Sequence, residues 1–214
     1  MAVSESTAQR YLQSDPDVRL MMQVRDDDAD AFEELVLRYQ SRLLMVLKHM
    51  VGSREHAEDL TQEVFLRVYR ARKRYEPGAK FATWLFTIAN NAASNAIRSL
   101  SRRREVNVDG GANQSAVDPL DRMALAASGL LPTRQLDKAE RAEIVRLAVE
   151  SLNERQRMAL LLSKFEDMSY AEIAESMDMT TQAIKSLLSR ARGNLKTILE
   201  PYMTEGSRPE EEGQ

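Results

Sequence analysis

The sequence predicts an all-α protein in which two small helical domains are joined by a flexible linker. Apolar residues recur at the i, i+3, i+4 and i+7 spacing of one helix face through most of the chain. No stretch alternates apolar and polar residues for long enough to form a strand. Between the two periodic regions, residues 110–115 read GGANQS, a composition typical of flexible linkers.

These features divide the chain into five segments. We predict a disordered N-terminus, an N-terminal helical domain, a linker, a C-terminal helical domain and an acidic tail, at residues 1–14, 15–104, 105–136, 137–199 and 200–214. The first segment lacks apolar periodicity. The chain from residue 197 onward carries five acidic residues and one basic residue, which is typical of a solvated tail.

Composition excludes several classes of function. The 214 residues include no cysteine and two histidines, which rules out disulfides, a thiol nucleophile and thiolate metal sites. His56 lies among acidic residues, but no second histidine stands nearby at ligand spacing, and we predict neither a metal site nor a cofactor. No apolar run reaches the ~20 residues of a membrane-spanning helix. The N-terminus also lacks the apolar stretch of a secretion signal, so we expect a cytoplasmic protein without membrane insertion.

Charge is distributed unevenly, although the net charge is only −3. Residues 26–63 hold ten acidic and four basic residues, a net charge of −6, whereas residues 64–105 hold ten basic and two acidic residues, a net charge of +8. A second basic cluster within residues 182–196 contains Lys185, Arg190, Arg192 and Lys196 and no acid. These blocks indicate one surface for a basic partner and others for a polyanion; the alternative is a set of solvated helix faces.

The N-terminal domain is predicted to contain four helices. They span about 15–25, 30–51, 53–74 and 82–103, and the Pro77-Gly78 pair predicts a loop over 75–80. Their expected capping and boundary residues are Asp15 with Pro16, Asp30, Gly52 and Ser53.

The helix at 82–103 has a polar face suited to an exposed base. Thr87, Asn91, Asn95, Arg98 and Arg102 lie within about 80° of one another on this face. Around its start, aromatic and basic residues are interleaved: Tyr75, Phe81, Trp84 and Phe86 with Arg72, Lys73, Arg74 and Lys80. Single-stranded nucleic acid is bound by such a mixture, because rings stack on bases and cations bind phosphates. The alternative role for each aromatic taken alone is a core residue.

The C-terminal domain contains the pattern of a helix-turn-helix. Asn153 is the expected cap of a helix at 153–165, and Ser169 and Glu172 form a capping-box sequence at the start of a short helix. Asp178 then stands where a left-handed residue is usual in the turn, and Thr180 or Thr181 is the expected cap of a long helix.

One face of that long helix is polar and basic, and it comprises Gln182, Lys185, Ser186, Ser189 and Arg190. The opposite third of the circumference is apolar. The second helix of a helix-turn-helix enters the DNA major groove, where Lys and Arg contact guanine and Gln contacts adenine. The pattern therefore predicts duplex DNA binding; the alternative is an ordinary helical hairpin with a basic exterior.

Taken together, these motifs resemble the extracytoplasmic-function sigma factors of bacterial RNA polymerase, in the sigma-70 superfamily. Residues 57–70 (AEDLTQEVFLRVYR) resemble the family's polymerase-binding helix, and residues 81–98 (FATWLFTIANNAASNAIR) resemble the segment that captures the promoter −10 element. Residues 151–165, 169–174 and 184–192 resemble its −35-binding domain. The resemblance covers roughly 17–104 and 137–199, in the family's order.

The resemblance implies roles for individual residues. The residues matching its contacts to the clamp helices of the polymerase largest subunit are Asp59, Gln62 and Glu63. The −10 DNA-binding set, with its pocket for a flipped base, is Tyr75, Lys80, Phe81, Trp84, Asn91, Asn95 and Arg98. The −35 DNA-binding set is Gln182, Lys185, Ser186, Ser189 and Arg190. Leu187 stands where the family commonly has Arg, so no −35 sequence preference is transferred.

We therefore predict a sigma factor and not an enzyme, with core RNA polymerase, promoter DNA and, as the resemblance implies, an anti-sigma factor as its partners. The alternative is a helix-turn-helix regulator that binds duplex DNA independently of polymerase, usually as a symmetric dimer on a palindrome.

Overall fold

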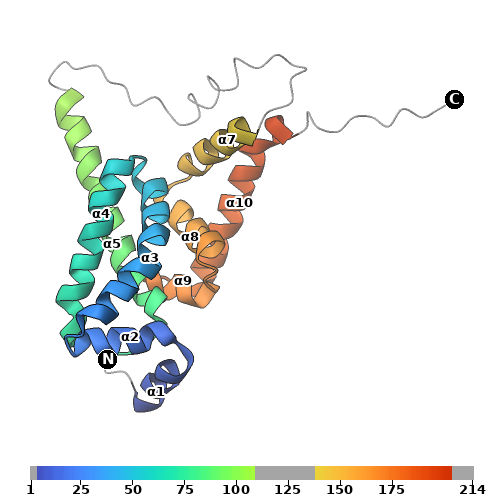
Figure 1. Cartoon of the computed structure of the whole chain (residues 1–214). Coiled ribbons are helices and arrows are strands. Elements are labelled where there is room, and N and C mark those ends of the chain that lie inside the picture. Colours follow the sequence, from blue (N-terminus) through green and yellow to red (C-terminus); the bar gives the residue numbers. More distant parts are fainter. Residues whose placement is uncertain (1–3, 109–137, 204–214) are drawn as a thin grey trace.

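The computed structural model describes residues 4–108 and 138–203, with side chains for residues 4–102 and 139–202. Within these ranges all regular structure is helical (Figure 1), which confirms the predicted fold class. The helices are α1 (Glu5–Ser14), α2 (Pro16–Arg25), α3 (Ala29–Val51), α4 (Arg54–Ala71), the 3-10 turn η1 (Arg72–Arg74), α5 (Phe81–Val108), α7 (Lys138–Glu150), α8 (Glu154–Phe165), α9 (Tyr170–Ser176) and α10 (Thr181–Met203).

Most predicted helix boundaries agree with the structure, because they depend on local capping. Gly52 ends α3 in the left-handed conformation, with φ 73°, and Ser53 is the N-cap of α4. The cap of α3 is a correction, since Asp28 fills this position instead of Asp30. Asp28 Oδ1 accepts from the backbone N–H groups of Asp30 and Ala31 at 3.0 and 3.1 Å.

The N-terminus is a second correction. Residues 1–14 were predicted to be disordered, but Glu5–Ser14 form helix α1, capped by Ser4. Tyr11 and Leu12 pack half-buried against the core, and Arg19 of α2 donates to the Leu12 backbone carbonyl at 3.0 Å. Tyr11 and Leu12 alone are too few to give a periodic pattern. The sequence therefore could not predict that this segment forms a helix packed on α2.

Asp15 joins the starts of two helices that are far apart in the sequence. Its Oδ1 accepts from the N–H of Asp17 at 2.9 Å, which caps α2, and its Oδ2 accepts from the N–H of Phe81 at 2.9 Å, at the start of α5. The first of these bonds follows from the Asp15-Pro16 pattern. The second brings the loop over 75–80 and the start of α5 against α2.

We expect Asp15→Ala to lower the free energy of unfolding by about 2 kcal/mol, since one lost cap costs about 1 kcal/mol and this carboxylate serves two helices. The control is Asp28→Ala, which removes the cap of α3 alone. Urea denaturation of both variants measures the difference. Equal destabilisation by the two substitutions would show that the bond to Phe81 adds nothing.

In the C-terminal domain the predicted caps are present. Asn153 accepts from the Gln156 N–H at 3.0 Å at the start of α8, and Ser169 and Glu172 form the reciprocal capping box of α9. Asp178 adopts the left-handed conformation, with φ 52°. Between the two expected caps of α10 the structure selects Thr180, whose Oγ1 accepts from the Ala183 N–H at 3.2 Å. The helix-turn-helix is therefore formed as predicted.

The boundaries of the predicted linker and tail shift. Helix α5 continues to Val108, into the segment 105–136 that was expected to be linker, and α10 continues past residue 199 to Met203. Helix α10 continues across Pro201, although Pro usually ends a helix. The remainder of the linker, and the tail from residue 204, lie outside the described residues.

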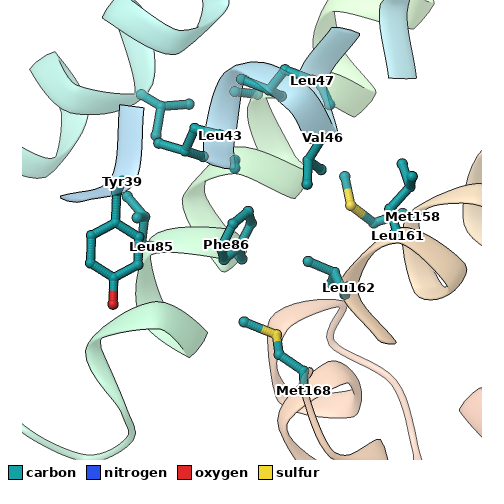
Figure 2. Close-up of a cluster of buried hydrophobic side chains, with 14 of the residues drawn as sticks. Tyr39, Leu43, Val46, Leu47, Leu85, Phe86, Met158, Leu161, Leu162 and Met168 are labelled. Atoms are coloured by element: carbon teal, nitrogen blue, oxygen red, sulfur yellow. The ribbon is translucent and has the colours of Figure 1, made fainter. Parts of the chain in front are cut away.

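The two domains share one hydrophobic core. Figure 2 shows Leu43, Val46 and Leu47 of α3 and Phe86 of α5 facing side chains of α8. Those side chains are Met158, Leu161 and Leu162, and all of them are fully buried. A separate small cluster packs α7 on the end of α10. The sequence predicted two domains, and the structure places the helix-turn-helix domain directly against the N-terminal bundle, with α9 on α5 and α8 on α3.

None of the helices within the described ranges is both long and apolar enough to cross a membrane.

Candidate nucleic-acid and protein interfaces

Helix α4 presents the predicted acidic surface to solvent. Its apolar side, with Leu60, Val64 and Val68, is buried against the rest of the N-terminal bundle. Asp59, Gln62 and Glu63 are therefore all exposed. Glu63 pairs with Arg67 one turn further on, at 2.5 Å. In Figure 1 this helix lies on the side of the molecule away from α10.

Two apolar residues on the same face were missed in the sequence. Leu66 and Tyr69 are 54% and 40% exposed, although large apolar side chains are usually buried. They continue the helical stripe of Asp59 and Gln62 at the next i+3 and i+4 positions. Their spacing was the available signal, but apolar residues within a helical pattern are ordinarily assigned to the core. We define Asp59, Gln62, Glu63, Leu66 and Tyr69 as the α4 face.

The polar face of α5 is also open. Asn91, Asn95 and Arg98 are exposed, as the periodicity predicted. Arg98 donates to Asn95 Oδ1 at 3.0 Å and to the Ser94 carbonyl at 3.1 Å, so this guanidinium and this amide are already oriented. Asn91 makes no side-chain hydrogen bond within the described part of the chain, and its donor and acceptor are both available to a ligand.

The aromatic residues of the predicted base pocket are placed differently. Tyr75 and Phe81 are buried, at 2% and 0% exposure, and Trp84 is half-buried. The Trp84 ring packs against Tyr75 at a centroid distance of 4.8 Å and against Phe81 at 6.1 Å. The structure therefore places Tyr75 and Phe81 in the core of the chain without DNA, and their contact with a flipped base stays a prediction. Both rings are buried because removing their large apolar area from water is favourable.

Burial also affects the Tyr75 hydroxyl, which has no hydrogen-bond partner within the described residues. Burial raises the pKa of Tyr75, and the nearby charge of Asp15 raises it further. Both effects favour the neutral phenol, and the Tyr75 ring packs edge-on against Trp84.

Lys80 and Arg98 lie where the two domains meet. Lys80 Nζ pairs with Oε1 of Glu172 in α9 at 2.8 Å, and this carboxylate raises the pKa of Lys80. Further along α5, Arg98 lines a groove of about 860 Å³ between α5 and the helix-turn-helix domain, opposite Arg155 and Thr180. Two predicted nucleic-acid residues of the first domain thus border the second domain.

Helix α10 presents its predicted polar face to solvent. Its opposite side is anchored in the core by Ile184, Leu188 and Ala191, all at 0% exposure. The predicted DNA-binding residues are exposed except for the half-buried Ser186: Gln182, Lys185, Ser186, Ser189 and Arg190. Arg190 donates to Ser186 Oγ at 3.1 Å, which orients the guanidinium along the helix.

Leu187 is half-buried and packs against the hydrophobic core. It is therefore held by the fold and does not extend from the polar face of α10. The structure leaves predicted residues exposed on three helices, α4, α5 and α10, whereas Tyr75 and Phe81 are buried.

Comparison with known proteins shows the family to which the chain belongs. The family model "Sigma-70 region 2" matches residues 35–103, and "Sigma-70, region 4" matches residues 142–195. The RNA polymerase sigma-H factor of Pseudomonas aeruginosa is 31% identical over 199 residues, which cover 91% of this chain and 99% of the relative. The ECF RNA polymerase sigma-E factor of Escherichia coli K12 is 32% identical over 189 residues, which cover 86% and 94%.

Solved structures agree. The sigma factor RpoE of Bartonella quintana, solved with the anti-sigma factor NepR, is 26% identical with a TM-score of 0.59, over 79% of this chain and 96% of that one. CnrH, solved with the cytosolic domain of CnrY, has a TM-score of 0.61 at 20% identity, over 85% and 96%, which shows a common fold. The α4 and α5 surfaces lie within the region 2 match, and the α10 surface lies within the region 4 match. The chain therefore belongs to the extracytoplasmic-function sigma factors of the sigma-70 family, which are non-enzymatic factors that direct promoter-specific transcription initiation by RNA polymerase.

Proposed function

We propose that the α4 face binds the clamp helices of the largest subunit of core RNA polymerase. The observation that supports this is the combination of exposed acidic residues with exposed Leu66 and Tyr69 on one helix stripe. An apolar centre bordered by charge is typical of protein interfaces, where burial supplies affinity and complementary charge supplies orientation. A basic partner surface fits this arrangement.

The α5 polar face is the proposed site for an unpaired −10 base. Asn91 has an available amide, and the oriented pair of Asn95 and Arg98 lies one turn further along the same face. An amide offers both a donor and an acceptor to a base edge, while the guanidinium binds the neighbouring phosphate. Trp84, supported from below by Tyr75 and Phe81, supplies a partly exposed ring beside them.

Helix α10 is the proposed reader of the −35 element in duplex DNA. Its exposed Gln, Lys, Ser and Arg side chains suit base edges and phosphates, and the packing of Leu187 into the core removes it from this set. An anti-sigma factor is a proposed partner, because two solved relatives of this fold were captured with CnrY and NepR. Since its polymerase acts on chromosomal DNA, the proposed location is the cytoplasm.

In vitro transcription tests this function directly. Purified chain added to core polymerase should direct initiation from a discrete set of promoters, and mapped start sites should share −35 and −10 elements. The helix-turn-helix regulator, which is the alternative, predicts instead that the chain alone binds a palindromic duplex tightly and that core polymerase gains no promoter specificity from it.

We expect Lys185→Ala to weaken binding of the holoenzyme to duplex −35 DNA by about 1–3 kcal/mol, the usual value of one major-groove contact. The control is Lys48→Ala, which removes the same charge from an exposed position on α3. Fluorescence anisotropy with labelled duplex at constant salt measures both affinities. Unchanged affinity in Lys185→Ala would contradict the assignment of this residue.

A further inference from the structure

Tyr69 is the last residue of the α4 face, and its ring is held by two neighbours. It packs against the half-buried Phe32 of α3, at a centroid distance of 5.1 Å and an interplanar angle of 53°. Phe32 in turn meets the buried Phe65 edge-on at 6.4 Å, which connects it to the core. The second neighbour is the Arg72 guanidinium, which lies over the Tyr69 ring at 3.9 Å from its centroid. The ring is exposed, but both contacts restrict its rotation.

Arg72 is fixed over this ring through all three of its side-chain nitrogen atoms. Nη1 donates to the Tyr69 backbone carbonyl at 2.9 Å. Nε donates to Oδ1 of Asp27 at 3.1 Å, and Nη2 lies 3.0 Å from the same oxygen. The Arg72 side chain is 21% exposed, which leaves little of it for a partner protein to contact. These contacts point to a role that Arg72 exerts through Tyr69.

Asp27, which anchors Arg72, adopts a backbone conformation that favours glycine. It follows α2 in the left-handed region, with φ 70°, where helices commonly end on glycine. Aspartate tolerates this conformation better than most residues do, but glycine adopts it without strain. The Asp27 carboxylate binds Arg72 and also accepts from Lys73 Nζ at 2.5 Å. The hydrogen bonds from Lys73 and Arg72 lower the pKa of Asp27. What an aspartate adds at this position is therefore the charged anchor for Arg72.

An exposed tyrosine with a fixed ring is suited to contribute a large share of the affinity of an interface. Tyrosine is enriched among the interface residues whose truncation costs most affinity, since it buries a large ring and loses few rotamers. A ring that is already oriented loses still less freedom on binding. Leu66 lies beside Tyr69 on the α4 face and is also exposed. Together they form the apolar end of the stripe that begins with Asp59.

We propose that Arg72 and Asp27 are positioning residues, which hold the Tyr69 ring in the orientation that binds core polymerase. This inference rests on the proposed function of the α4 face and adds two residues that lie outside that face. Asp27 also precedes residues 35–103, which the region 2 family model matches, so it is not part of the matched pattern. The turn between α2 and α3 thereby acts on a surface that α4 presents.

A double-mutant cycle, in which purified core polymerase is titrated with each labelled variant, tests the role of Arg72. Tyr69→Ala should lower the affinity about ten-fold or more. Arg72→Lys, which keeps the positive charge but loses the planar guanidinium, should lower it about three-fold or more. In the Tyr69→Ala background Arg72→Lys should cause no further loss, because no ring is left to position. A full further loss there would show that Arg72 does not act through Tyr69.

The matched control is Arg70→Lys, the same change at an exposed position of α4. It should leave the affinity for core polymerase unchanged. A loss equal to that of Arg72→Lys would contradict the proposal, since any arginine at this end of α4 would then have the same effect.

Asp27→Gly separates positioning from stability. Glycine adopts the left-handed conformation without strain, and exposed ion pairs contribute little, so the midpoint of urea unfolding should equal or exceed that of the wild-type chain. Affinity for core polymerase should nevertheless fall by about the same factor as in Arg72→Lys, and this loss should disappear in the Tyr69→Ala background. Asp178→Gly makes the same change at another left-handed residue, in the helix-turn-helix, and should leave core binding unchanged. Full affinity in Asp27→Gly would overturn the proposal.

The outcomes distinguish this inference from the function on which it rests. If Tyr69→Ala binds core polymerase with full affinity while Asp59→Lys/Glu63→Lys does not bind, the inference fails and the docking surface stands. If the charge-reversal variant also binds with full affinity, the proposed docking of the α4 face on core polymerase fails as well.

Discussion

Substitution of Asp59 and Glu63 by lysine is expected to abolish binding to core polymerase, with a loss of at least 100-fold in affinity. Both residues are exposed on α4, so the substitutions leave the buried side of the helix intact. Placing like charges opposite each other in an interface costs several kcal/mol, and about 1.4 kcal/mol corresponds to ten-fold in affinity. Pull-down and fluorescence titration with purified core polymerase measure the effect.

The control for this experiment is the pair Glu33→Lys and Glu34→Lys, which makes the same change of net charge on exposed positions of α3. Circular dichroism of both double variants establishes that they are folded. If the α4 variant binds core polymerase as well as the α3 variant does, the α4 face is not the docking surface.

The second large effect is expected for Asn91→Ala, which should reduce open-complex formation by about 10- to 100-fold while core binding is unchanged. Extruding a base from the duplex costs a few kcal/mol. The Asn91 amide is available to offset that cost, since it has no hydrogen-bond partner within the described residues. Permanganate reactivity of unpaired thymines in the −10 element reports the opening.

The neighbouring Asn90→Ala is the matched control. It removes the same amide one position earlier, where the side chain lines the groove toward the helix-turn-helix domain instead of the open polar face. Normal permanganate reactivity in Asn91→Ala, or an equal loss in both variants, would show that the base is not held by Asn91.

The helices and their caps were largely predictable from the sequence. The capping box of Ser169 and Glu172, the Asn153 cap and the left-handed Asp178 depend on residues within four positions of each other. Such signals are local, and so a sequence pattern carries them. The one wrong cap, Asp30 in place of Asp28 at the start of α3, also concerns a local signal. Two acidic residues two positions apart both satisfy the capping pattern, and the chain turns at Asp27, with φ 70°, directly before Asp28.

Exposure was less predictable than periodicity. On α10 the two agree, because its two faces differ clearly in polarity. On α4 the exposed Leu66 and Tyr69 look like core residues in the sequence, whereas around the start of α5 the buried Tyr75 and Phe81 look like a binding surface. An aromatic or aliphatic side chain is suited both to a core and to an interface, and only the neighbouring helices determine which role it takes.

The sequence by itself determined the all-α fold, the helix-turn-helix, the polar stripes on α5 and α10 and the family. Each of the first three depends on residues close together in the chain, and the family follows from motifs that match its pattern. The tertiary structure alone decided helix α1, the double cap by Asp15, the burial of the aromatic rings and the closed packing of the two domains. The ion pair of Arg42 and Glu166 joins residues 124 positions apart. No local pattern encodes such a pair, since it depends on the free energy of packing two whole domains together.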